Sequence, residues 1–226
     1  MEFSSYFGIV LTLLTFISAS FIQKKTKIII FNPILISVIC VIALLLMFHI
    51  PYETYQQSAQ YISYLLTPAT ISLALPLYKQ IYLLKENIKA ILLGIVAGVL
   101  SSLSSVYLFA LLFAFTHQEY ATFLPKSITT AIGMGISEEL GGIVSLTVAS
   151  IIITGIIGNI SATYILKLFH IKEPIAKGLA IGCASHAIGT SKAMEIGEIE
   201  GAMSSLAIVL SGLITVLLAN IFILLL

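Results

Sequence analysis

Long runs of uncharged apolar residues constrain the fold of this chain more than any motif does. Residues 90–115 and 202–226 contain no charged side chain, and about 20 apolar residues are enough for an α-helix to cross a bilayer. Hydrophobic residues make up 59% of the chain and charged residues 9%, which is far from the balance of a soluble domain. The sequence therefore predicts an all-α, polytopic membrane protein.

The same hydropathy pattern predicts about seven or eight membrane segments in a single membrane domain. Five segments are predicted as complete helices, at 5–22, 28–50, 90–115, 143–169 and 202–226. Three others are shorter or interrupted by proline and polar residues, at 61–78, 121–136 and 178–191. We interpret these three as broken or re-entrant helices, because exposed backbone inside a membrane is tolerated only where it is buried in protein or lines a cavity.

The positions of the lysines constrain the topology. Lysines cluster at 23–27, 79–89 and 167–177, whereas the loops at 51–60 and 116–120 have none, and lysine-rich loops tend to be cytoplasmic. Full crossings throughout would place the third cluster outside, but a re-entrant segment at 121–142 returns it to the cytoplasm. This tendency is statistical, and a hairpin at 178–191 is an alternative. The first span is predicted to stay as a helix, with its N-terminus outside.

Several kinds of chemistry are excluded by the residues that are missing. The chain has no Asp and no Arg, and neither HExxH nor GxxxxGK[ST] occurs. Cys40 and Cys183 lie in apolar surroundings without a CxxC partner, and His49, His117 and His170 fall at span ends without metal-ligand spacing. We therefore expect no enzymatic activity, no metal site, no cofactor and no nucleic-acid partner.

Two polar motifs interrupt the apolar sequence at equivalent positions. Residues 129–133 read TTAIG and residues 185–189 read SHAIG, an offset of 56, and Glu139 and Glu195 follow at the same spacing. Each motif precedes a long apolar helix, so the pattern predicts internal repeats at 121–169 and 178–226, a common feature of transporters. The alternative is that small residues only allow close packing, as Gly94 and Gly98 do in a GxxxG pattern.

Four separated blocks resemble the LrgB/CidB family of bacterial membrane proteins, in the same order and almost end to end. The blocks are YFGIVLTLLTF (6–16), LTPATISLALPLYKQ (66–80), LPKSITTAIG (124–133) and IAKGLAIGCASHAIGTSKAMEIGEIEGAMSSLA (175–207). The SHAIGTSKA segment is more similar to the CidB branch. The resemblance implies a multi-pass protein of the bacterial cytoplasmic membrane.

The resemblance also implies a partner and two possible functions. The family acts with a small holin-like membrane protein of the LrgA/CidA type. It has been described as a holin and antiholin system that controls murein hydrolase activity and autolysis. It has also been described as a carrier of small carboxylates, pyruvate in bacteria and glycolate or glycerate in the related plastid translocator. We expect a pyruvate-like carboxylate carrier that forms a homo-oligomer in the lipid bilayer; the alternatives are a regulator of autolysis and a structural scaffold.

A carboxylate needs a cation or hydrogen-bond donors within the membrane, and few residues can supply them. The candidate substrate-binding residues are Lys126, Thr129, Thr130, Ser185, His186, Thr190 and Ser191. The predicted helix breaks are at Pro68, Pro76, Pro125, Gly133 and Gly189, and Thr70 and Ser72 could line the same cavity. Broken-helix N-termini would add backbone N–H groups. For Lys126 the alternative is that its side chain reaches the membrane interface.

Proton coupling is a further hypothesis, with His186, Glu139 and Glu195 as candidates. For His186 the alternative is a neutral ring hydrogen-bonded to a neighbouring helix. The remaining charged residues after each motif, Glu138, Lys192, Glu198 and Glu200, are expected to be solvated. Asn159 fits a glycosylation pattern but lies in an apolar span, so we interpret it as a packing or hydrogen-bonding residue.

Overall fold

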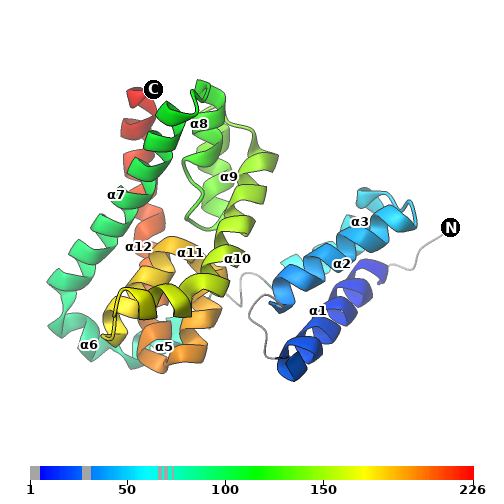
Figure 1. The fold of residues 1–226 in the computed structure, drawn as a ribbon, viewed down its shortest axis with the longest axis horizontal. Coiled ribbons are helices and arrows are strands. Elements are labelled where there is room, and N and C mark those ends of the chain that lie inside the picture. Colours follow the sequence, from blue (N-terminus) through cyan, green and yellow to red (C-terminus); the bar gives the residue numbers. More distant parts are fainter. Residues whose placement is uncertain (1–5, 27–31, 66–67, 69–70, 73) are drawn as a thin grey trace. The chain divides into compact units, whose positions relative to one another are not determined.

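The computed structural model describes residues 6–26, 32–65, 68, 71–72 and 74–226. Every element assigned in these residues is helical, which confirms the all-α fold. Contacts divide the chain into two compact units, residues 1–72 and 73–226 (Figure 1). That the two units form one functional membrane domain stays a prediction.

The helices with described bounds in the first unit are α1 (Phe7–Thr26), α2 (Pro33–Met47) and α3 (Tyr52–Ser63). Hydroxyl groups join them within largely apolar surfaces: Ser58 Oγ accepts from the Gly8 N–H at 2.7 Å, and the Thr15 and Ser37 hydroxyls lie 3.0 Å apart. Helix α2 is shorter than the predicted span at 28–50, because Asn32 caps its first turn through two backbone N–H groups. The start of that predicted span and Thr70 lie outside the described residues.

The second unit contains the remaining helices. They are α5 (Ala74–Lys79), α6 (Ile81–Glu86), α7 (Ile88–Leu112), α8 (His117–Phe123), α9 (Thr130–Glu139), α10 (Val144–Leu168), α11 (Pro174–Ile196), α12 (Glu198–Phe222) and the short 3-10 helix η1 (Ile223–Leu225). Four helices of the described chain are long and apolar enough to cross a membrane: α1, α7, α10 and α12 extended by η1. They agree with four of the five predicted complete spans.

Helices α8 and α9 form a hairpin that enters the second unit and returns to the same end. Tyr120 on α8 donates a hydrogen bond to the carbonyl of Phe222, at the end of α12. The tip then reaches the middle of α12, where Ile132 packs against Gly212. The chain returns beside its entry point, because the Ile143 N–H donates to Thr122 Oγ1 at 2.8 Å. This is the re-entrant segment predicted at 121–142.

Helix α11 is also a hairpin, although its two arms are continuous in the chain. In the first arm, Gly178 packs on Glu200 and Gly182 packs on Ser204 of α12. In the second arm, Thr190 contacts Ser204 through a 2.7 Å hydrogen bond, and Met194 packs on Gly201. Both arms therefore lie along the first turns of α12 and run in opposite directions. The structure agrees with the hairpin alternative for 178–191 and not with a crossing.

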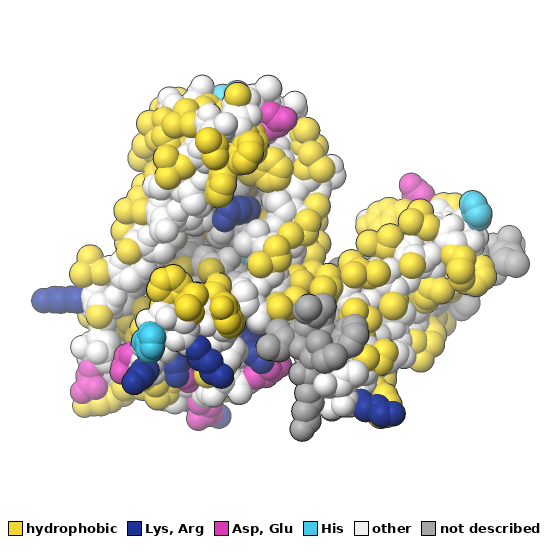
Figure 2. Space-filling view, viewed as in Figure 1, with side chains coloured by type: hydrophobic (Ala, Val, Ile, Leu, Met, Phe, Trp, Pro, Cys, Tyr) yellow, Lys and Arg dark blue, Asp and Glu magenta, His cyan; other side chains and the backbone are white. Residues whose placement is uncertain are grey.

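The two hairpins enter from opposite ends of the second unit. Helix α10 connects them and has 25 residues, a length of about 37 Å, which exceeds the roughly 30 Å of a bilayer core. The lysine clusters at 79–89 and 167–177 lie at the end from which α11 enters. Figure 2 shows basic and acidic side chains gathered there, over α5, α6 and the start of α11. We call this the lysine-rich end.

Candidate functional site

The tips of the two hairpins meet in the interior of the second unit. A small cavity of about 10 Å³ is lined by Pro125 and Ser127 from the first hairpin and by Cys183 from the second. Ser211 and Thr215 of α12 close it. The two breaks in helical hydrogen bonding are thus buried against protein, as the membrane requires of exposed backbone.

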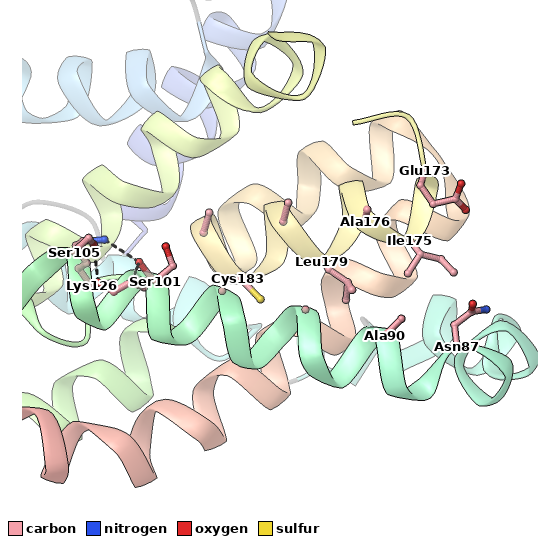
Figure 3. Close-up of a pocket in the computed structure, with 16 residues that line it drawn as sticks. Asn87, Ala90, Ser101, Ser105, Lys126, Glu173, Ile175, Ala176, Leu179 and Cys183 are labelled. Atoms are coloured by element: carbon pink, nitrogen blue, oxygen red, sulfur yellow. Dashed lines mark hydrogen bonds between the residues drawn. The ribbon is translucent and has the colours of Figure 1, made fainter. Parts of the chain in front are cut away.

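A larger cavity of about 720 Å³ lies between α7 and α11. Figure 3 shows it extending from Asn87 and Glu173 near one end to Ser101, Ser105 and Lys126 near the other. The first end corresponds to the starts of α7 and α11, so it lies at the lysine-rich end. The hollow is visible on the surface of the second unit in Figure 2.

Small residues make room for this cavity. The α7 face that lines it is Ala90, Gly94, Gly98, Ser101, Ser102 and Ser105, one stripe at helical spacing. A Cβ at Gly98 would lie 3.0 Å from Cys183 Cβ, so the two helices approach closely at that level. Gly94 and Gly98 therefore allow close packing, as the GxxxG pattern predicted.

Lys126 is the cationic group at the inner end of the cavity. Its Nζ donates to Ser127 Oγ at 3.1 Å, and Ser102 Oγ donates to the same oxygen at 2.9 Å. Within the described residues, the ion pairs are Lys79–Glu198, Lys177–Glu200 and Lys192–Glu195, so no described carboxylate pairs with Lys126. A half-buried ammonium without a counterion is costly in a membrane, and it offers one positive charge to an anion.

The polar residues after Lys126 add unsatisfied donors. Thr129 is the N-cap residue of α9, and its side chain makes no capping hydrogen bond. No acceptor in the described residues takes the backbone N–H groups of Thr130, Ala131 or Ile132. Such groups at the start of a helix carry partial positive charge. Thr129 and Thr130 do not line the large cavity itself.

His186 is the break residue of the second hairpin. Its backbone has φ 42° and ψ −139°, a conformation that only glycine adopts readily. The ring is buried between α10 and α11, with Nε2 2.9 Å from the carbonyl oxygen of Ile151. Since a carbonyl only accepts, Nε2 carries a proton and donates. This geometry agrees with the alternative of a histidine bonded to a neighbouring helix, while proton coupling stays a prediction.

The other predicted residues of the second motif contact neighbouring helices. Thr190 donates to the carbonyl of His186 at 2.9 Å and shares a 2.7 Å hydrogen bond with Ser204. Ser185 is buried so closely against α10 that a Cβ at Gly158 would overlap its hydroxyl. Ser191 accepts a hydrogen bond from Asn159, which also donates to the Ile188 carbonyl. Asn159 is thus a hydrogen-bonding residue between helices, as predicted.

The two carboxylates at matching positions after the polar motifs lie far apart, and the prediction for a third carboxylate is wrong. Glu139 and Glu195 are exposed at opposite ends of the second unit, and Glu195 pairs with Lys192 at 2.8 Å. Glu200, predicted to be solvated, is instead buried at the start of α12 and lies 3.5 Å from Lys177. Glu200 is buried because α11 folds back over α12, and the positive charge of Lys177 offsets its negative charge.

Two of the predicted helix breaks, those at Gly133 and Gly189, are wrong. Pro125 lies at a break, between the end of α8 and the start of α9, because proline has no N–H to donate. Gly133 and Gly189 lie inside helices, where a Cβ would overlap Ile151 and Ser185 respectively. Both glycines allow close packing.

The two other predicted breaks are prolines between α3 and α6. Pro76 lies in the first turn of α5, where proline is tolerated. Near Pro68, Ser72 Oγ donates to the Pro68 carbonyl at 2.8 Å.

Several cavity residues were missed by the motif search. Ser127 accepts a hydrogen bond from the Lys126 ammonium, and Ser102 donates to Ser127. Ser101, Ser105, Asn87 and Glu173 line the same cavity. The available signal was the sequence SSLSS at 101–105, in the middle of an otherwise apolar span.

Replacing His186 tests the unusual backbone of the second hairpin. Both His186→Gly and His186→Ala remove the bond to Ile151, but only alanine keeps a Cβ at φ 42°. We expect the alanine variant to be less stable than the glycine variant by about 1–3 kcal/mol, the reverse of their order in a regular helix. Thermal unfolding in detergent measures the difference, and an alanine variant equal to or more stable than glycine would contradict the break.

Comparison with known proteins identifies the family of this chain. The model of the LrgB-like family matches residues 12–225. The chain is 38% identical to antiholin-like protein LrgB of Bacillus subtilis (strain 168), over 221 residues that cover 97% of this chain and 96% of the relative. No solved structure matches. The predicted family is confirmed, and this multi-pass membrane protein belongs to the LrgB-like family.

Proposed function

We propose that this protein is a carrier of small carboxylates, such as pyruvate or glycolate, that binds its substrate at Lys126. The observation that carries the proposal is a cationic side chain without a described counterion, at the inner end of a 720 Å³ cavity. Hydroxyl groups of Ser101 and Ser127 line the same end and can donate to a carboxylate. One charge and several neutral donors suit a small monoanion.

The arrangement of hairpins supports alternating access. The cavity extends from the lysine-rich end to Lys126 (Figure 3). Beyond it, the other end is closed by α8, where Tyr120 is fully buried and bonded to the Phe222 carbonyl. Oppositely oriented broken segments that meet at the membrane midplane are the usual architecture of secondary transporters. We infer that movement of the first hairpin away from α12 opens the second path.

Uptake by proteoliposomes tests the carrier. Liposomes that contain this protein, with and without a small holin-like subunit, should accumulate labelled pyruvate or glycolate down a gradient. Absence of saturable uptake in both preparations would contradict the proposal. The homo-oligomer and the orientation with an external N-terminus belong to the same proposal, and protease protection of an N-terminal tag tests the orientation.

Coupling of transport to protons through His186 is a separate part of the proposal. Histidine is the side chain that most readily gains and loses a proton near physiological pH, so a coupled His186 would make uptake depend on pH. His186→Gln keeps a donor that can reach the Ile151 carbonyl but cannot titrate. The variant should lose this pH dependence, and an unchanged profile would exclude His186 as the coupling residue.

A second candidate function is regulation of autolysis, because the Bacillus subtilis relative is named an antiholin-like protein. A protein that forms or controls a large pore predicts leakage rather than saturable transport. The same liposomes, loaded with labelled pyruvate and an unrelated dye of larger size, distinguish the two functions. Release of both solutes together would favour the pore, whereas saturable movement of pyruvate alone favours the carrier.

A further inference from the structure

A second, separate pocket lies at the lysine-rich end, between the end of α10 and the two arms of α11. Its volume is about 420 Å³. Four of the residues that line it are basic or titratable: Lys167, His170, Lys172 and Lys177. Leu166 and Ile196 contribute an apolar wall. The pocket therefore combines positive charge with a hydrophobic surface.

Most of this positive charge is not compensated by neighbouring carboxylates. Lys177 lies 3.5 Å from Glu200, but Lys167 and Lys172 take part in none of the ion pairs of the described residues. Glu173 is adjacent in the sequence, but it lines the large cavity on the other side of α11. The pocket thus has a net positive charge and attracts an anion.

The backbone conformation at His170 brings the basic residues of this pocket together. Helix α10 ends at Leu168, and His170 then adopts a left-handed conformation with φ 54°. The N–H of Ile171 donates back to the Leu166 carbonyl at 2.9 Å, which closes the helix end. This turn brings the chain back across the end of α10, so that residues before and after it line one pocket.

The depth of the pocket matches the headgroup region of a bilayer. Lys167 lies in the last turn of α10, a helix long enough to cross the membrane. Tyr164 beside it is 67% exposed, and exposed tyrosines near the end of a span mark the membrane interface. An anion bound here would lie at the level of lipid phosphates, with its apolar part against Leu166 and Ile196.

We propose that this pocket binds the phosphate headgroup of an anionic phospholipid. The phosphate would accept hydrogen bonds from Lys167 and Lys172, and the start of an acyl chain would cover the apolar wall. Basic pockets between membrane helices recognise anionic lipids in this way. The lipid would hold the end of α10 and the hairpin α11 together, independently of whether the large cavity carries a substrate.

The test measures lipid binding and requires no transport. The full-length protein in a neutral detergent is titrated with phosphatidylglycerol, phosphatidylcholine or inorganic phosphate, and thermal unfolding and native mass spectrometry report binding. Phosphatidylglycerol should raise the melting temperature, and phosphatidylcholine should not. Lys167→Gln combined with Lys172→Gln should weaken phosphatidylglycerol binding by roughly 25-fold, about fivefold for each lysine.

The matched control is Lys85→Gln combined with Lys89→Gln. These two lysines are also exposed near the lysine-rich end but do not line this pocket. The control should retain binding. Equal loss in both double variants, or no loss in either, would overturn the proposal. Equal stabilisation by inorganic phosphate at the same concentrations would overturn the assignment to a lipid and identify a soluble phosphate as the ligand.

Discussion

Replacement of Lys126 by glutamine is expected to reduce carboxylate uptake by roughly 10- to 100-fold. A hydrogen bond to a charged group contributes about 1.5–3 kcal/mol, and no other described lysine lines the inner end of the cavity. Glutamine keeps a donor that can reach Ser127 but removes the positive charge. The fall should appear in the ratio of maximal rate to half-saturating concentration, measured in proteoliposomes.

The same variant separates a binding role from a structural one. An uncompensated ammonium costs about 2.5–3.5 kcal/mol on membrane-insertion scales, so Lys126→Gln should be at least as stable as the natural protein towards heat. Lys89→Gln, which removes an exposed lysine outside the cavity, should leave uptake unchanged. Normal uptake by the Lys126 variant would instead show that the side chain only reaches the membrane interface.

Substitution of Gly182 by valine is expected to destabilise the second hairpin by about 3 kcal/mol, the upper part of the range for overpacked cores. A Cβ at this position would lie 2.5 Å from the backbone oxygen of Ser204 and 2.7 Å from Ala207 Cβ. Backbone cannot rotate away as a flexible side chain does, so α11 and α12 must separate. The loss of stability is measured by thermal unfolding in detergent.

Gly135→Val is the matched control for this effect. Gly135 also lies inside a helix, but a Cβ there would meet no atom within 4 Å. Valine is a better helix former than glycine, so the control should unfold at the same temperature as the natural protein or slightly above it. A large loss in Gly135→Val, or none in Gly182→Val, would contradict the packing of α11 on α12.

The helical class and the long spans could be predicted because they depend on local chemistry. Runs such as 90–115 and 202–226 satisfy their own backbone hydrogen bonds only as helices within lipid. The break at Pro125 is equally local, because proline lacks the N–H that a helix needs. The lysine pattern also indicated that 121–142 turns back, since charge resists transfer across the membrane.

Glycine positions could not be assigned from the sequence, because a glycine can either break a helix or allow two helices to pack closely. Gly133 and Gly189 suggested breaks, yet the chain is helical at both and the missing side chains allow neighbours to approach. The break is instead at His186, and no neighbouring residue in the sequence predicts a positive φ there. Burial of Glu200 was missed for a related reason, since its partner Lys177 precedes it by a complete hairpin.

The sequence by itself determined that this chain is a helical membrane protein, where its long spans lie, and to which family it belongs. Only the tertiary structure decided that α11 is a hairpin and that Lys126 lies beside a cavity, bonded to Ser127, which also accepts from Ser102. Hydropathy and proline act on neighbouring residues, so they can be read along the chain. A cavity depends on which helices pack together, and contacts between residues far apart in the sequence decide that packing.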